Sequence, residues 1–169
     1  MFKDIVDPLE RMRPRTGTSD HRTGNRKDMS DVPFEEIPSL LLRTVPETAE
    51  FIAEKYEMPA EAAVLTEDVP FQLYPVLAEC FMTPILMPQL ESDTPDTELL
   101  ERCWDFVERL TEHSLESVRG AAYFEVLEQL LNADGLVEAA WPYMKERTRA
   151  RTLTMLDGYG VYLPGINRR

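Results

Sequence analysis

Five acidic residues between positions 98 and 112 recur at alternating intervals of three and four residues. They are Glu98, Glu101, Asp105, Glu108 and Glu112. Residues three and four apart share one face of an α-helix, and this face lies opposite an apolar side that contains Cys103, Phe106 and Leu110. We therefore predict an outward-facing acidic stripe, the name used below for these five residues. Because a surface of one charge sign speeds the approach of oppositely charged proteins, the stripe is a candidate binding face for a basic partner.

Two other interpretations of the stripe stay open. Arg102 follows Glu98 by four residues, and Arg109 follows Asp105 in the same way, so ion pairs within the helix and contact with water could account for the pattern. A basic run also occurs in the last helical region. It comprises Lys145, Arg147, Arg149 and Arg151. Packed beside the stripe, this run would neutralise part of its charge.

The residue types used for metal binding and nucleophilic catalysis are sparse. The chain has two histidines, His21 and His113, and two cysteines, Cys80 and Cys103, and none belongs to an HExxH or CxxC motif. Each cysteine lies in an apolar helical pattern, which predicts a buried and inert thiol. His113 falls at the end of a predicted helix, where we expect a structural role. The sequence therefore predicts no metal site, no cofactor and no catalytic residue of these types.

An enzyme is still an alternative, because carboxylates distant in sequence can meet in space and act as acid and base. The candidate is Glu79, which lies inside the most apolar stretch of the chain, residues 71–90. Burial there would raise the pKa of its carboxyl group and suit it for proton transfer. The competing interpretation, which the residue type favours, is a surface carboxylate or one paired with an arginine.

The same stretch contains a cluster of apolar side chains. It comprises Phe81, Met82, Ile85, Leu86 and Met87. Methionine fills irregular cores and also lines adaptable binding grooves. Core filling is the expected role. The alternative is an apolar groove around Phe81, Met82 and Met87, which a structural or regulatory adaptor would use.

Composition limits the class of partner. The chain has 169 residues, of which 31 are acidic and 18 basic, and its net charge is −13. Residues 29–143 alone hold 24 acidic residues against five basic ones. This balance disfavours nucleic acid, whose phosphates are bound by clustered Lys and Arg, and it permits a basic protein partner. It gives no indication of the oligomeric state.

The sequence has no pattern typical of a membrane span. The apolar stretch 71–90 contains Glu79 and three prolines, and the first fifteen residues lack the apolar run of a signal peptide. Two cysteines that are predicted to be buried form no disulfide framework. We therefore expect a cytoplasmic protein that does not enter a membrane.

The charge changes sign along the chain and predicts its division. Residues 1–28 hold seven basic residues against five acidic ones. We predict a flexible basic segment over residues 1–30, an all-helical domain over 31–163 and a short basic tail over 164–169. Met29 stands just before the globular pattern begins, so we also consider the hypothesis that it is the true start.

Apolar residues recur at helical spacing from Pro33 onward, and no stretch alternates with a period of two. The predicted fold class is all-α, a compact array of about six to eight short antiparallel helices in one domain. The strongest pattern is a helix over about residues 95–113. Its apolar face contains Leu99, Leu100, Cys103, Trp104, Phe106, Val107 and Leu110.

Capping residues and prolines predict the ends of the other helices. The predicted starts are a capping box of Thr44 and Glu47, the dipeptides Thr83-Pro84 and Thr94-Pro95, and Ser114. The helix after Ser114 is expected to reach about Asn132 and to bury Ala122, Phe124, Val126, Leu127, Leu130 and Leu131. A last helical region covers about residues 136–156, with a break at Pro142, and glycines on both sides of Tyr159 end it.

The order of these segments resembles that of small helical bacterial proteins from toxin–immunity loci. The segments that carry the resemblance are LLLRTVPETAEFIAEKY (40–56), TPILMPQLE (83–91), ELLERCWDFVERL (98–110) and YFEVLEQLL (123–131). The resemblance implies a non-catalytic function, in which an immunity protein neutralises a toxin domain by covering its active site or an essential surface. Many such toxin domains are basic nucleases, which an acidic inhibitor would suit. The resemblance assigns no site residues.

Overall fold

Residues 32–67 and 72–168 are described by the computed structural model. Within these ranges the fold is all-α, as the sequence predicts, and the only β-type contact is an isolated bridge between Pro164 and Arg168. The predicted flexible segment 1–30, and with it the hypothesis about Met29, lies outside the described residues.

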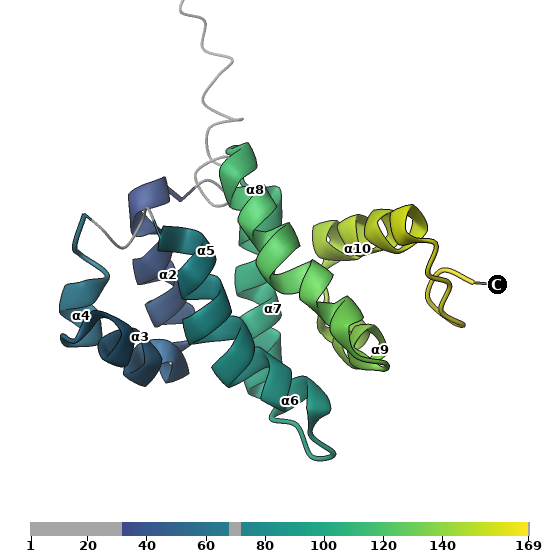
Figure 1. Ribbon diagram of the computed structural model, residues 1–169, viewed down its shortest axis with the longest axis horizontal. Helices are drawn as coiled ribbons and strands as arrows, with labels where there is room; N and C mark the ends of the chain where they lie inside the picture. The colour runs from purple at the N-terminus through teal and green to yellow at the C-terminus, as the bar shows by residue number, and fades with distance from the viewer. Residues whose placement is uncertain (1–31, 68–71, 169) are drawn as a thin grey trace, which may run out of the picture.

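Helix α7 (Thr97–Glu112) lies at the centre of the fold (Figure 1). All seven residues of its predicted apolar face are buried, which confirms the strongest pattern in the sequence. Burial of each large apolar side chain stabilises the fold by about 1.5–3 kcal/mol. The helix packs against α2 (Ile37–Thr44), α8 (Glu116–Ala122) and α10 (Glu146–Tyr159).

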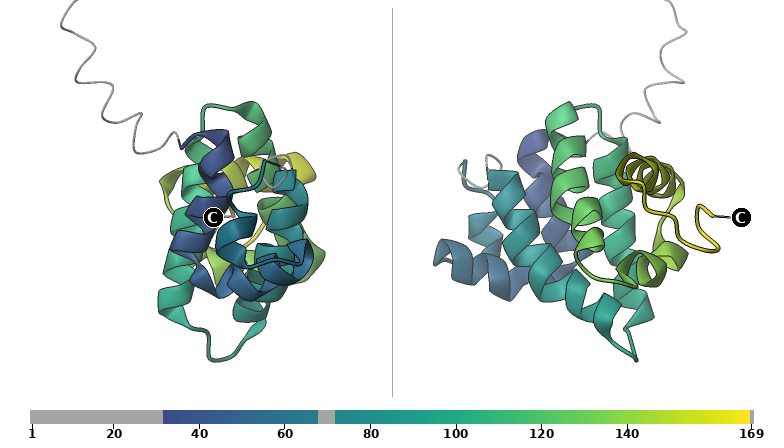
Figure 2. Two further views of the ribbon diagram at one scale, coloured as in Figure 1. Left: turned by 90° about the vertical axis from the view of Figure 1, so that its left-hand side faces the viewer. Right: turned by 45° about the vertical axis from the view of Figure 1, so that its right-hand side comes forward.

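The first helices form one end of the molecule, which faces the viewer in the left-hand view of Figure 2. They are η1 (Phe34–Glu36), α2, η2 (Pro46–Thr48), α3 (Ala49–Tyr56) and α4 (Ala60–Ala63), shown in purple and blue in Figure 1. The predicted capping box is wrong, because Thr44 is the last residue of α2 rather than a helix cap. Val45 leaves the helical conformation since a residue before proline is hindered there. The hydroxyl of Thr48 donates a hydrogen bond to the carbonyl of Val45 at 2.7 Å.

A continuous helical rod follows, and Figure 1 shows it crossing the molecule diagonally. It consists of α5 (Leu73–Val76), the π-helical η4 (Leu77–Leu86) and α6 (Met87–Glu91). The predicted helix start at Thr83-Pro84 is therefore wrong, because Pro84 lies inside η4. A proline in a regular α-helix clashes with the carbonyl four residues earlier, and the wider π-helical turn gives its ring room.

Two further helix starts differ from the prediction. The cap of α7 is Asp96, whose carboxylate accepts a hydrogen bond from the amide of Leu99 at 3.1 Å, rather than Thr94. Helix α8 begins at Glu116, and its N-cap position is Leu115 rather than Ser114. In the preceding turn the amide of Leu115 donates instead to Nδ1 of the His113 ring at 3.1 Å.

The chain continues from α8 without interruption through η5 (Tyr123–Leu127), which is π-helical, and η6 (Glu128–Asn132). The helix ends at Asn132 as predicted, but Phe124 is 48% exposed instead of buried and Leu131 is only half-buried. A π-helical turn holds an additional residue, so the regular α-helical spacing from which Phe124 was assigned to the core does not apply there.

The last region contains α9 (Leu136–Ala140), η7 (Trp141–Tyr143) and α10. Pro142 lies in η7, where the predicted break occurs. Gly160 ends α10 with a positive φ of 67°, a conformation that suits glycine. After it, Val161, Leu163 and Ile166 pack against the core. No helix in the described part of the chain is both long and apolar enough to cross a membrane.

Candidate functional site

The acidic stripe lies on the side of α7 that faces away from the core, as its spacing predicts. Glu98, Glu101, Asp105 and Glu112 are exposed, and Glu108 is half-buried. Most of these carboxylates already contact other parts of the chain. The ammonium group of Lys145 lies 2.7 Å from the carboxylate of Glu101 and 3.6 Å from that of Asp105. The hydrogen bond to Glu101 raises the pKa of Lys145.

The carboxylate of Glu108 binds backbone amides at the start of α10 instead of facing open solvent. Its Oε1 accepts hydrogen bonds from the amide of Thr148 at 2.7 Å and from the hydroxyl of Thr148 at 2.9 Å. Its Oε2 accepts from the amide of Arg147 at 3.0 Å. A helix begins with amides that have no partner within the helix, so a side chain of α7 caps α10 from outside.

Glu98 belongs to an ion-pair cluster around Arg102. The guanidinium of Arg102 donates to Glu98 at 3.0 Å, which confirms one of the two pairs predicted within the helix, whereas Asp105 is paired with Lys145 and not with Arg109. It also binds the carboxylate of Glu47 with two hydrogen bonds, at 2.8 and 2.9 Å, and so joins α7 to η2. The bonds from Arg102 lower the pKa of Glu47. In the stripe, Glu112 is the member with no hydrogen bond or ion pair to another described residue.

The remaining negative charge is distributed unevenly. Residues 32–67 and 72–98 hold 13 acidic residues against two basic ones, Arg43 and Lys55, whereas residues 99–168 hold 11 against eight. The excess therefore lies on the part of the fold from η1 to the first turn of α7, which contains Glu98. This part occupies the left and lower regions of Figure 1. We call it the acidic half.

A groove lies between this half and the helix that contains η5 and η6. Its volume is about 420 Å³. One wall is the rod formed by η4 and α6, and the other is formed by η5 and η6. The lining residues are Ala78, Met82, Thr83, Met87, Pro88, Glu91, Glu125, Gln129 and Asn132. We call it the methionine groove. Phe81 does not line it, contrary to the groove alternative from the sequence, because its ring is fully buried and packs edge-on against Phe106.

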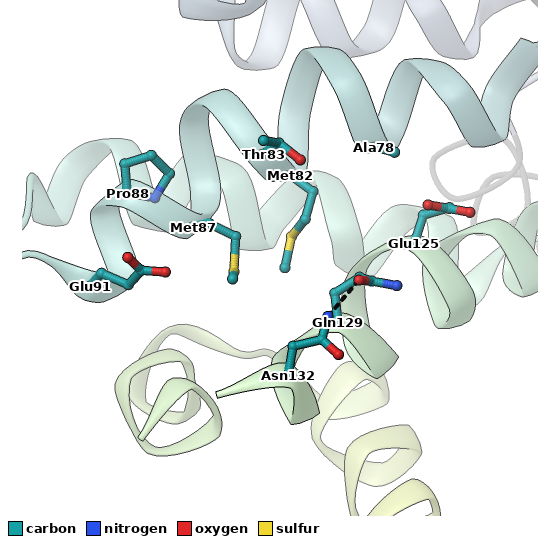
Figure 3. Close-up of a pocket in the computed structure, with 9 residues that line it drawn as sticks. All are labelled: Ala78, Met82, Thr83, Met87, Pro88, Glu91, Glu125, Gln129 and Asn132. Carbon is teal, nitrogen blue, oxygen red and sulfur yellow. Dashed lines mark hydrogen bonds between the residues drawn. The ribbon is translucent and has the colours of Figure 1, made fainter. Parts of the chain in front are cut away.

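Figure 3 shows how these side chains lie. Met82 and Met87 point into the space between the two walls, toward Gln129 and Asn132, while Glu91 and Glu125 stand near its opposite ends. Asn132 donates to the side chain of Gln129 at 2.7 Å, which orders the second wall. Partial burial raises the pKa of Glu125. The groove thus has a soft apolar floor between two carboxylates, in which Met87 is half-buried and Met82 is almost fully buried.

Both walls of the groove contain π-helical segments. The residues Ala78, Met82 and Thr83 belong to η4, and Glu125 belongs to η5. The two segments pack against each other. Single π-helical turns within helices are uncommon and occur frequently at functional sites. This geometry marks the groove as the candidate binding site.

The other residues singled out in the sequence have structural environments. Burial raises the pKa of the Cys80 thiol to about 11 and of the Cys103 thiol to about 12, so both are protonated near neutrality. His113 is buried, and because its Nδ1 accepts from Leu115, its Nε2 carries the proton and donates to the carbonyl of Val32 at 2.6 Å.

Glu79 is exposed and forms an ion pair with Lys55. The hypothesis of a buried Glu79 with an acid–base role is therefore wrong. Among residues 32–67 and 72–168, no three His, Cys, Asp or Glu side chains are grouped so that they could hold a metal ion.

No protein-family model matches the chain, and neither the curated proteins nor the solved structures that were compared with it include a match.

The sequence indicated Met82 and Met87 as candidate groove residues, but it did not indicate the residues of the opposite wall. Glu125 could have been noticed, because it is the one carboxylate among apolar residues from Ala121 to Leu127. Gln129 and Asn132 carry no such signal. Their part in the groove depends on the packing of η5 and η6 against a segment about 45 residues earlier, which spacing alone does not give.

Proposed function

We propose that this chain is a non-catalytic domain that binds a basic protein partner, and that the methionine groove receives part of that partner. The observation that supports this most directly is the arrangement of Met82 and Met87 between Glu91 and Glu125. A segment with apolar side chains flanked by Lys or Arg would place its apolar part on the methionines and its cations at the two carboxylates.

The acidic half supports the same proposal at longer range. Thirteen acidic residues against two basic ones would attract a positively charged protein before contact and raise its association rate. The stripe contributes less than its sequence implies, because Glu101, Asp105 and Glu108 already have partners within the fold. We therefore assign the main electrostatic role to the acidic half and a secondary one to the stripe.

The narrower form of the proposal is an immunity-type inhibitor of a basic toxin. Two of the four segments that resemble immunity proteins, residues 83–91 and 123–131, contribute to the two walls of the groove. Under this proposal the partner is a toxin domain, and binding covers its active site or an essential surface.

Affinity capture at low salt from cells that produce the protein, followed by binding measurements with the purified hit, tests the general proposal. The variant Glu91→Gln with Glu125→Gln removes both groove carboxylates. Its matched control, Glu146→Gln with Asp157→Asn, removes two exposed carboxylates outside the groove. We expect a basic partner whose affinity falls about tenfold in the groove variant and not in the control.

Salt distinguishes this proposal from the adaptor alternative, which the apolar floor of the groove favours. Binding dominated by Met82 and Met87 would change little between about 0.05 and 0.5 M salt, whereas electrostatic binding would weaken strongly. A partner that is acidic, or that binds the groove variant and the wild type equally, would overturn the proposal. The toxin form requires in addition that one equivalent of the chain abolishes the activity of the partner.

The stripe needs its own variant. Glu101→Lys with Asp105→Lys reverses two stripe charges and leaves Glu108, and therefore the cap of α10, in place. Slower association with an unchanged dissociation rate would establish the secondary role of the stripe. An unchanged association rate would remove the stripe from the binding surface.

A further inference from the structure

A second cavity, of about 520 Å³, lies on the other face of the α8–η5 helix, where it meets α7 and α10. Its lining residues are Thr111, Glu116, Arg119, Gly120, Tyr123, Phe124, Leu127 and Arg151. It shares none of these residues with the methionine groove. We call it the arginine cavity.

The two arginines of this cavity are held by neutral groups. Nη1 of Arg119 donates to the carbonyls of His113 and Ser114, each at 2.7 Å, which fixes this side chain beside the turn between α7 and α8. Three of the five N–H donors of its guanidinium are not used in these two bonds. The guanidinium of Arg151 lies 4.5 Å from the centre of the Tyr123 ring, a stacking contact that leaves its own donors available.

Neither arginine has a carboxylate within salt-bridge distance among the described residues. This sets them apart from Arg102 and Lys145, which each contact two carboxylates. Glu116 contributes one negative charge to the lining and leaves the cavity with an excess of positive charge. The charge of the cavity is therefore opposite in sign to that of the acidic half.

Aromatic side chains form the rest of the wall. The rings of Tyr123 and Phe124 meet edge to face at 5.0 Å, and Phe124 is 48% exposed, although apolar side chains of this size are usually buried. Leu127 continues the apolar surface. Cationic donors beside an aromatic wall suit a ligand with an anionic end and a flat apolar end.

We propose that the arginine cavity binds a monocarboxylate joined to a flat apolar group. The carboxylate accepts hydrogen bonds from Arg119 and Arg151, and the apolar group packs against Phe124 and Leu127. A single negative charge fits better than several, because the net charge of −13 repels polyanions. This ligand differs in charge from the basic protein partner and uses a different face, so either proposal can fail without the other.

Titration of the full chain with 3-phenylpropionate, followed by amide chemical shifts and calorimetry, tests the proposal. We expect saturable binding with shifts at Arg119, Phe124 and Arg151. The neutral analogue 3-phenylpropionamide tests the charge, and inorganic phosphate and acetate test the apolar end. Each should bind at least about tenfold more weakly than 3-phenylpropionate, since each lacks one of the two interactions.

The variant Arg151→Gln should weaken the binding of 3-phenylpropionate about tenfold. The Arg151 side chain is exposed and makes no hydrogen bond to another described residue, so its replacement should leave folding intact. Arg147→Gln is the matched control, because Arg147 is an exposed arginine of the same helix that does not line the cavity. Absence of binding at about 10 mM ligand, equal binding of the amide, or equal loss in both variants would overturn the proposal.

Discussion

Glu108 of α7 caps α10 through Thr148, accepting hydrogen bonds from both its amide and its hydroxyl at 2.7 and 2.9 Å. The residue at the usual cap position of α10, Lys145, makes no such bond. Glu108 therefore stabilises the fold, although its position in the acidic stripe suggests only a surface charge. Charge reversal across the whole stripe would affect folding as well as binding.

Glu108→Ala should destabilise the protein by about 2 kcal/mol, because it removes the cap of α10 and leaves two backbone amides without their acceptor. Urea unfolding followed by circular dichroism measures this loss. Glu112→Ala is the control, since Glu112 lies one turn further along the same face and its side chain makes no hydrogen bond to a described residue. Equal losses in the two variants would contradict the capping role.

His113→Leu should destabilise the fold by roughly 1–3 kcal/mol, because the carbonyl of Val32 and the amide of Leu115 lose a buried partner. The effect should also be local. Hydrogen exchange of the Leu115 amide should accelerate more than that of amides in the middle of α7. If only global stability changed, the ring would act through packing alone.

The pair of Glu47 and Arg102 should make stability depend on pH in the acid range. Arg102 holds the pKa of Glu47 below its ordinary value of 4.5, so the folded protein takes up this proton less readily than the unfolded chain. The stabilisation is present above pH about 4.5 and is lost as the pH falls through the lowered pKa. Because the Glu47 side chain is 38% exposed, the contribution is a few tenths of a kcal/mol.

Unfolding of the wild type and of Glu47→Gln at a series of pH values measures this contribution. The variant should be slightly less stable at pH 7, and the difference should disappear as the pH falls below the lowered pKa of Glu47. Added salt should reduce the difference at pH 7. A difference that persisted unchanged over the whole acid range would assign the effect to packing.

Cys80 and Cys103 should not react with a thiol reagent in the folded protein at pH 8. Both side chains are fully buried, and burial raises the pKa of each thiol to about 11 or above, so the reactive thiolate is scarce. Dithionitrobenzoate should modify both thiols in denaturant and neither in buffer. Rapid modification of the native protein would show that one of the surrounding helices opens readily.

The sequence was informative where one helix could be considered alone. The apolar face of α7, from Leu99 to Leu110, follows regular 3.6-residue spacing, and every residue predicted to be buried there is buried. The break at Pro142 and the end of α10 at Gly160 follow from the backbone limits of proline and the freedom of glycine.

Prediction was weaker where the helix itself was irregular or where the partner was distant. Thr83-Pro84 was assigned to a helix start because proline is a poor residue inside an α-helix, and Phe124 was assigned to the core by α-helical spacing, but both lie in π-helical segments. The candidate site was reached only in part. Met87 was visible in the sequence, while Glu91 and Glu125 were brought to the same groove by tertiary packing.

The π-helical segment η5 also affects how this groove could be lost. The segment η5 is a single π-helical stretch of five residues, and a π-helical turn accommodates one residue more than an α-helical turn, so removal of one residue from η5 would restore regular α-helical spacing. The side chains before the deletion would then turn by about 100° relative to those after it. Homologous sequences with a gap of a single residue in η5 would therefore keep a helix and lose this groove. Such a gap, more than any one substitution, would separate homologues that retain the groove from those that do not.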